Sequence, residues 1–123
     1  MKDRNAMKLT FNMFIEYLVE TPLSKYDIHW VPMYLTCKPC LVKYKIIGRT
    51  DSIKEDSEAI LREIGVNRSL PVAHAQPGGN SKVKIQEFYA DFDRELLTKL
   101  YKVYEMDFIL FGYSSYEYSL SRH

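Results

Sequence analysis

Residues 29–56 read H-W-V-P-M-Y-L-T-C-K-P-C-L-V-K-Y-K-I-I-G-R-T-D-S-I-K-E-D, and the interpretation of the fold starts from this stretch. The run from Leu41 to Ile47 is rich in Val, Ile and Tyr and closes on Gly48, which is typical of a buried strand. Asp51 or Ser52 is expected to start a helix, and Glu55 has the spacing of a capping box from Ser52. The stretch therefore predicts a strand, a short turn and a helix.

Helical periodicity extends over much of the remaining chain. Residues 10–20 carry apolar side chains at the i, i+3, i+4, i+7 spacing of one helix face, which predicts a helix that Thr10 caps and Pro22 ends. The helix that starts near Ser52 should end at Gly65. Two more helices are predicted, one from about Lys82 to Ala90 and one that begins after Asp93 as N-cap.

The segments between these elements carry their own expectations. Residues 21–36 are expected to be irregular, and the apolar stretch 106–113 is expected to dock on the core as a tail. The pattern is mostly helix with one convincing strand. Because a lone strand cannot pair with itself, we expect its partner strands to lie outside these residues.

Composition favours one folded domain whose positive and negative charges nearly balance. The chain has 123 residues, of which 46% are hydrophobic, so disorder throughout is not expected. Its 17 basic and 16 acidic residues give a formal net charge of +1, so no global basic field would attract DNA or a polyanionic glycan, and a local basic patch stays open. No apolar run approaches the roughly 18–20 residues needed to span a bilayer. We expect a single domain over residues 1–123, with 1–8 and 117–123 flexible.

Two cysteines, Cys37 and Cys40, form a C-x-P-C pair. The spacing is that of a thioredoxin-type redox pair, but such a pair needs its first cysteine at a helix N-terminus, and here a strand-like run follows. A zinc site would need four ligands, which His29 and His74 could complete. The structural alternatives are a disulfide in an oxidising compartment or two buried thiols in a reducing one. Asn67 begins an Asn-x-Ser glycosylation sequon.

Two groups of residues are candidates for binding. The imidazole of His29 can take a proton from a sugar hydroxyl, and the indole of Trp30 offers an apolar face to a pyranose ring. The alternative is that Trp30 is a core anchor and His29 bonds to the backbone. A Gly-Gly turn followed by a predicted helix N-terminus with lysines forms a candidate anion site, and the alternative is a solvated loop. The residues of this second group are Asn80, Ser81, Lys82 and Lys84.

The stretch 29–56 and the later L-Y-K-V-Y-E-M-D-F-I-L-F-G-Y-S resemble the C-terminal region of Golgi carbohydrate sulfotransferases, a group that includes the chondroitin and dermatan 4-O-sulfotransferases. The resemblance covers roughly residues 9–116. It implies an α/β fold with a P-loop-type nucleotide site, of which this chain is the C-terminal part, mostly helical with one to two strands. It also implies transfer of sulfonate from 3′-phosphoadenosine 5′-phosphosulfate (PAPS) to a sugar hydroxyl of a glycosaminoglycan or glycoprotein glycan.

The resemblance also implies roles for individual residues. It supports a disulfide between Cys37 and Cys40, and it places His29 and Trp30 near the acceptor as substrate-binding residues. It likens residues 80–84 to the loop that closes over the nucleotide. It implies a Golgi-lumenal protein whose membrane contact is an N-terminal anchor that this sequence does not contain. No metal is implied.

The family's phosphosulfate loop and the segment that holds the 3′-phosphate have no equivalent in this sequence. Both lie upstream of the matched region in the family. We therefore expect no turnover by this chain alone, and we assign no catalytic residue. Two other functions stay open: a non-catalytic truncated product that binds a glycan or a full-length enzyme, and a small thiol-redox protein that uses Cys37 and Cys40.

Overall fold

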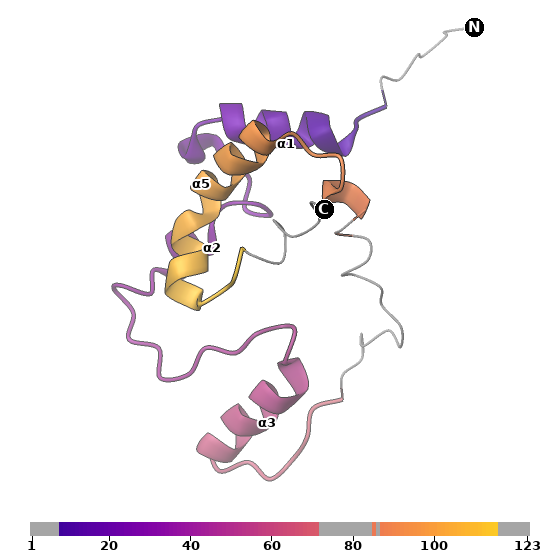
Figure 1. The fold of residues 1–123 in the computed structure, drawn as a ribbon. Coiled ribbons are helices and arrows are strands. Elements are labelled where there is room, and N and C mark those ends of the chain that lie inside the picture. The colour runs from indigo at the N-terminus through magenta and orange to yellow at the C-terminus, as the bar shows by residue number, and fades with distance from the viewer. Residues whose placement is uncertain (1–7, 72–84, 86, 116–123) are drawn as a thin grey trace, which may run out of the picture. The chain divides into compact units, whose positions relative to one another are not determined.

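The structure is a computed structural model that describes residues 8–71, 85 and 87–115, and this part of the chain is built from helices (Figure 1). Its described residues divide into two units. The first unit comprises residues 8–38, 85 and 87–115, and the second comprises residues 39–71. The elements along the chain are α1 (Phe11–Glu20), the 3-10 helix η1 (Leu23–Lys25), α2 (Met33–Cys37), α3 (Ile53–Glu63) and α5 (Arg94–Phe111).

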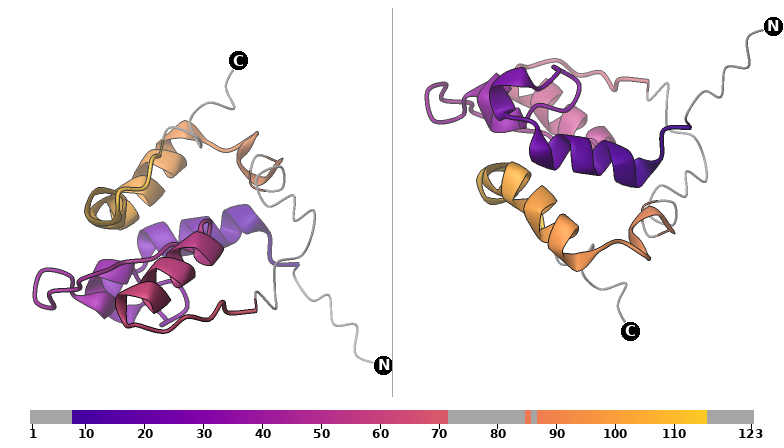
Figure 2. Two further views of the ribbon diagram at one scale, coloured as in Figure 1. Left: turned by 90° about the horizontal axis from the view of Figure 1, so that it is seen from below. Right: turned by 90° about the horizontal axis from the view of Figure 1, so that it is seen from above.

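The core of the first unit lies between α1 and α5, which run side by side (Figures 1 and 2). Ile15 and Leu18 on α1 are each 3% exposed, and they pack with Phe92 and Leu100, which are 6% and 9% exposed. Aromatic rings extend this core at its edge, where the ring of Phe11 lies 5.7 Å from that of Phe92. Burial of these apolar side chains is the main stabilising term available to the unit.

Side-chain caps fix the starts of α1 and α5 where the sequence predicts them. The hydroxyl of Thr10 accepts a hydrogen bond from the N–H of Met13 at 3.2 Å. The carboxylate of Asp93 accepts from the N–H groups of Glu95 and Leu96 at 2.6 and 3.1 Å. Both caps satisfy donors that have no partner within their own helix. These two predictions are confirmed.

Helix α5 is longer than the sequence pattern predicts. It continues through the stretch expected to form a docking tail and ends at Gly112, whose φ of 65° is the left-handed C-cap conformation. Met106 and Ile109 are 42% and 63% exposed, so much of this apolar stretch points into solvent. The expectation of a tail docked on the core is therefore corrected: residues 106–111 are helix.

A buried carboxylate on α5 holds the N-terminus of α2. Asp107, 6% exposed, accepts hydrogen bonds from the N–H groups of Met33 at 2.7 Å and Tyr34 at 2.8 Å. The residue before α2 is Pro32, which has no side-chain acceptor, so a residue 74 positions from Met33 caps this helix. A negative charge there is also favoured by the helix dipole. Residues 21–36, expected to be irregular, thus contain η1 and the start of α2.

The second unit is organised around Asp56 at the start of α3. Its carboxylate accepts from the N–H of Arg49 at 2.8 Å and from the hydroxyl of Ser52 at 2.7 Å. These bonds, the Arg49 N–H first, lower the pKa of Asp56 below its ordinary value. A Cβ at Gly48 would come within 3.3 Å of the Asp56 Cβ, so the close approach favours glycine. Ser52, one of the two predicted starts, is the N-cap residue. The capping box with Glu55 is wrong, because the Ser52 hydroxyl donates to Asp56 instead.

The end of α3 has the predicted glycine. Gly65 has a φ of 77°, and its N–H donates to the carbonyl of Arg62 at 3.1 Å. The N–H of Val66 donates to the carbonyl of Leu61 at 2.8 Å. These two bonds form a Schellman motif, which confirms the predicted role of Gly65.

The strand predicted from Leu41 to Ile47 is not present in the structure. All of its residues are exposed, Leu41 at 79% and Ile47 at 52%, and the N–H of Tyr44 makes a local bond to the Val42 carbonyl at 3.0 Å. A strand needs a neighbouring backbone for its ladder, and none of the described residues supplies one. The mostly helical character is as expected, whereas the one to two strands and the P-loop-type sheet are not confirmed.

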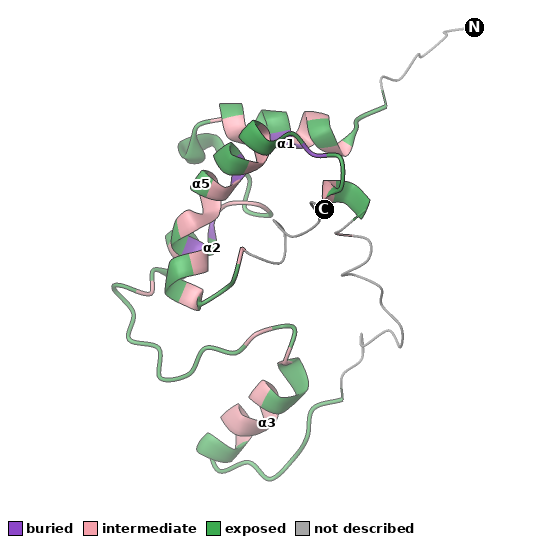
Figure 3. Ribbon diagram, in the orientation of Figure 1, coloured by how far each residue is buried: buried purple, intermediate pink, exposed green. Residues whose placement is uncertain are grey.

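Helix α3 has intermediate and exposed residues and no buried residue (Figure 3). The single domain over residues 1–123 stays a prediction. The flexible ends at 1–8 and 117–123 lie outside the described residues, apart from Lys8, and so does the predicted start of the helix at Lys82. Residues 85 and 87–89 of that helix are helical. None of the described helices is long and apolar enough to cross a membrane.

Replacing the α2 cap should destabilise the first unit. In Asp107→Ala the N–H groups of Met33 and Tyr34 lose a charged acceptor, and we expect the free energy of unfolding to fall by about 1.5–3 kcal/mol. Asp107→Asn keeps one acceptor oxygen and should lose less. Urea unfolding followed by the fluorescence of Trp30 measures the change. Asp91→Asn, at an exposed aspartate of the same unit, is the control. An Asp107→Ala midpoint equal to that of the control would contradict this role.

Removing the Asp56 carboxylate should open the loop that precedes α3. We expect the Arg49 amide to exchange with solvent at least about tenfold faster in Asp56→Ala, because its acceptor is lost and the loss of one such bond corresponds to roughly 1.4 kcal/mol or more. Hydrogen–deuterium exchange read by mass spectrometry or NMR reports this rate. Glu55→Ala changes the exposed acid beside it and should leave the rate unchanged. Equal Arg49 exchange in the two variants would rule out the bond as the cause of order.

Candidate functional site

The candidate site is a tight turn between η1 and α2 that presents His29 to solvent. The carbonyl of Asp27 accepts from the N–H groups of Trp30 at 3.1 Å and Val31 at 3.0 Å, so residues 27–31 form one closed turn. Pro32, fully buried, ends the turn and leads into α2. The backbone around His29 is thus fixed by local hydrogen bonds and by a buried proline.

Asp27 and His29 form a hydrogen-bonded pair within this turn. The Asp27 carboxylate accepts from the backbone N–H of His29 at 2.9 Å and also bonds Nδ1 of its ring. The hydrogen bonds from His29, the backbone one first, lower the pKa of Asp27, so the carboxylate is ionised at neutral pH. The His29 side chain is 80% exposed. With Nδ1 engaged, Nε2 is the ring nitrogen left to a ligand.

Trp30 is a core anchor that joins the turn to the first unit. Its ring packs edge-to-face on Phe14 at 5.4 Å and an interplanar angle of 82°. Its carbonyl accepts from the hydroxyl of Tyr104 on α5 at 2.7 Å. The indole Nε1 is buried, and no hydrogen-bond partner for it is found among the described residues. This packing agrees with the alternative in which Trp30 is a core anchor. The role of Trp30 as an apolar platform for a sugar ring stays a prediction.

The turn is tied to both long helices of the first unit. On its N-terminal side the hydroxyl of Tyr26 donates to the carbonyl of Leu18 on α1. On its C-terminal side Tyr104 donates to Trp30, and burial raises the pKa of Tyr104 to about 12. Burial also raises the pKa of Tyr26. His29 is therefore an exposed side chain on a well-supported backbone, which suits a group that must meet a ligand in one orientation.

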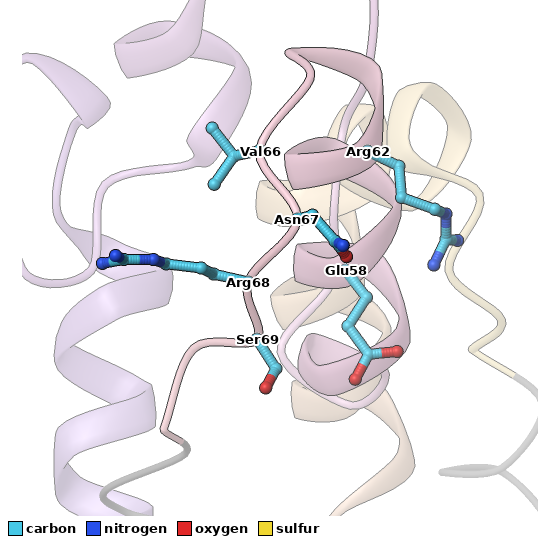
Figure 4. Close-up of a pocket in the computed structure, with 6 residues that line it drawn as sticks. All are labelled: Glu58, Arg62, Val66, Asn67, Arg68 and Ser69. Carbon is cyan, nitrogen blue, oxygen red and sulfur yellow. The ribbon is translucent and has the colours of Figure 1, made fainter.

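A pocket of about 620 Å³ lies within the second unit, beside α3 (Figure 4). Arg62 and Arg68 line it, but in Figure 4 their guanidinium groups point to opposite sides, so they do not converge on one anion. The sequon residues Asn67 and Ser69 also line this pocket and are exposed, as an acceptor for a glycan must be. Glycosylation of Asn67 stays a prediction.

The other predicted site residues fall in different places. Cys37 ends α2 and Cys40 follows its C-cap, and both are exposed, so the alternative of two buried thiols is wrong. The disulfide between them stays a prediction. The proposed anion site, residues 80–82 and Lys84, lies outside the described residues, and so does His74. Within the part of the chain that the structure describes, no group of three or more His, Cys, Asp or Glu side chains could hold a metal ion.

Two residues of this region were missed by sequence reasoning. Asp27 stands two residues before His29, and this D-x-H spacing is a local signal that would have suggested an Asp–imidazole pair. Asp107 lies within an apolar stretch of the sequence, where a carboxylate must find buried donors, but nothing in the sequence says that they belong to Met33 and Tyr34.

Comparison with known proteins gives consistent matches. The model of the sulfotransferase family matches residues 2–114. Carbohydrate sulfotransferase 11 of Rattus norvegicus is 30% identical over 115 residues, which cover 90% of this chain and 33% of the relative. Carbohydrate sulfotransferase 10 of Xenopus laevis is 30% identical over 123 residues, covering 91% and 35%. This chain spans about a third of the length of these relatives. No solved structure matches.

The Tyr104 hydroxyl should make the turn sensitive to high pH. Its raised pKa means that the folded state keeps the proton, so its stabilising effect is complete below pH 10, the ordinary value, and is lost as the pH rises through about 12. Tyr104→Phe should lose about 0.5–1.5 kcal/mol at pH 7 and show a shallower loss of stability between pH 10 and 12. Urea unfolding at several pH values measures both. Tyr17→Phe, at an exposed tyrosine, should follow the unmodified chain; parallel curves for both variants would contradict the assignment.

Proposed function

Because this chain belongs to the sulfotransferase family, we propose that it takes part in the transfer of sulfonate from PAPS to a hydroxyl group of a glycan. The observation that carries the proposal is the family match, which extends over residues 2–114. The relatives with about 30% identity are named carbohydrate sulfotransferases, which supports a sugar rather than a small phenol as the acceptor. A glycosaminoglycan or a glycoprotein glycan would supply such hydroxyls.

In this proposal the turn at residues 27–31 lies at the acceptor. His29 is exposed and its Nε2 is available, so it can bond a sugar hydroxyl. Trp30 is partly buried against Phe14, so it would contact the sugar only through the part of its ring that stays accessible. We propose His29 and Trp30 as substrate-binding residues, with His29 making the polar contact.

The donor would meet the chain at a different segment. We propose that Asn80, Ser81, Lys82 and Lys84 contact the phosphates of PAPS, because lysines and backbone N–H groups together favour an anion. The sequence carries no pattern for a phosphosulfate loop. Sulfonyl transfer needs donors and cations around the reacting oxygens, so we propose that this chain alone binds without turning over.

Golgi-lumenal location is part of the same proposal. The lumen is oxidising and glycosylating, so Cys37 and Cys40 would form a disulfide and Asn67 would carry a glycan. The exposure of Cys37, Cys40 and Asn67 is compatible with both modifications. Membrane attachment would depend on an N-terminal anchor of the kind that the family uses.

The non-catalytic alternative is a second candidate. The absence of a phosphosulfate-loop pattern supports a product that binds a glycan, or a full-length enzyme, without chemistry. The thiol-redox alternative has less support. Cys37 is the last residue of α2, whereas reactive thiolates are favoured at the opposite, N-terminal end of a helix.

Acceptor binding can be measured on the chain itself. We expect isothermal titration calorimetry to show saturable binding of an unsulfated chondroitin oligosaccharide, with the affinity reduced about three- to tenfold in His29→Ala through loss of one hydrogen bond. His123→Ala, which removes another histidine, should bind as the unmodified chain does. The acceptor assignment would be contradicted if the chain bound neutral dextran as tightly as the chondroitin oligosaccharide. It would also be contradicted if His29→Ala and His123→Ala bound the oligosaccharide with equal affinity.

The donor contact needs a separate titration. Adenosine 3′,5′-bisphosphate, the spent donor, should bind with low affinity, and the double variant Lys82→Ala, Lys84→Ala should abolish the heat of binding. Glycan binding by that variant should be unchanged. A bisphosphate titration with no heat in the folded, unmodified chain would remove the donor contact from residues 80–84 and favour the non-catalytic alternative.

A further inference from the structure

We propose that Asp27 is a positioning residue that fixes the proton of His29 on Nδ1, so that the Nε2 lone pair accepts the proton of the attacking sugar hydroxyl. The inference rests on the proposed function, because it concerns the same acceptor. What it adds to the candidate role of His29 is Asp27, a residue that acts through the imidazole.

The direction of the hydrogen bond follows from the partner. An ionised carboxylate can only accept hydrogen bonds, so the ring nitrogen that bonds Asp27 must carry the proton. The lowered pKa of Asp27 agrees with an ionised carboxylate at neutral pH. In the neutral ring Nδ1 is thus the protonated nitrogen, and Nε2 carries the lone pair. A histidine without such a partner would exchange between the two tautomers.

The orientation of the His29 ring is also restrained, because Asp27 bonds the backbone of His29 as well. The same Asp27 oxygen accepts the His29 N–H at 2.9 Å and bonds Nδ1, so the backbone and ring of His29 share one acceptor. The next residue, Trp30, is fixed through Phe14 and Tyr104. Among the described residues Asp27 is the charged group that contacts the imidazole. With 80% of the His29 side chain exposed, Nε2 is open to a ligand.

The chemical step balances with these groups and the phosphosulfate donor. The sugar oxygen forms a bond to sulfur, and the bond between sulfur and the bridging phosphate oxygen breaks. The electron pair of the broken bond leaves on the phosphate, and the hydroxyl proton moves to Nε2 of His29. The resulting imidazolium is stabilised by the Asp27 carboxylate. A positioned general base of this kind contributes about 10²–10⁴-fold to a rate.

The test reads the tautomer directly by ¹⁵N NMR of the labelled, full 123-residue chain. We expect the neutral imidazole of His29 in the unmodified chain to show a protonated Nδ1 and an unprotonated Nε2. Asp27→Ala should show a mixture of tautomers. Asp27→Asn keeps an oxygen that accepts from the backbone N–H and from Nδ1, so the turn survives, and the preference for the Nδ1-protonated tautomer should weaken without being lost. Asp91→Asn loses the same charge elsewhere and should keep the single tautomer.

Adding the unsulfated chondroitin oligosaccharide then tests the base. At saturation the Nε2 resonance of the unmodified chain should shift, because a hydroxyl donates to its lone pair, and the shift should shrink in Asp27→Asn. Identical tautomer populations in the unmodified chain and Asp27→Ala would overturn the inference. Glycan that binds by calorimetry without moving Nε2 would also overturn it while leaving the proposed function intact. No glycan binding at all would count against both.

Discussion

The buried carboxylate of Asp107 is the constraint on which the arrangement of the first unit depends. A buried charge is costly unless it is hydrogen-bonded, and here the first two N–H groups of α2 supply the bonds. Because α2 follows the turn at residues 27–31 after one buried proline, its position on α5 also sets where that turn lies. The exposed His29 therefore owes its placement to a side chain more than seventy residues further along the chain.

The local parts of this fold follow from the sequence, and the long-range parts do not. Thr10, Asp93 and Gly65 were found because a cap is decided by residues within one turn of it. The contact of Asp107 with α2 joins segments 74 positions apart, and no periodicity records it. The strand predicted for residues 41–47 is wrong for a related reason. Its composition suits a strand, but a strand forms only beside another backbone, which the described residues do not offer.

Part of the candidate site could be predicted from the sequence: His29 was predicted, and Asp27 was not. His29 stood out because imidazole next to indole suggests a sugar contact, but the two side chains have different surroundings in the structure. Trp30 is anchored on Phe14, whereas His29 is exposed and bonded to Asp27. Burial of one residue and exposure of its neighbour depends on the direction of the turn, which is set by the Asp27 carbonyl and the Tyr104 hydroxyl. The family, in contrast, could be predicted from residues 29–56 and the stretch that begins at Leu100, because the order of motifs along a sequence is visible without knowledge of the contacts.

The lack of buried residues in α3 bears on how this chain denatures. Among the described residues the buried apolar core lies in the first unit, as does Trp30, the single tryptophan of the sequence. No described residue of the second unit is buried, so this unit has little apolar burial of its own to hold α3 folded. Trp30 emission would then report the unfolding of the first unit only, and α3 would unfold at lower denaturant without changing that emission. Far-ultraviolet circular dichroism, which counts helix from both units, would begin to fall first, and the two curves would not superimpose.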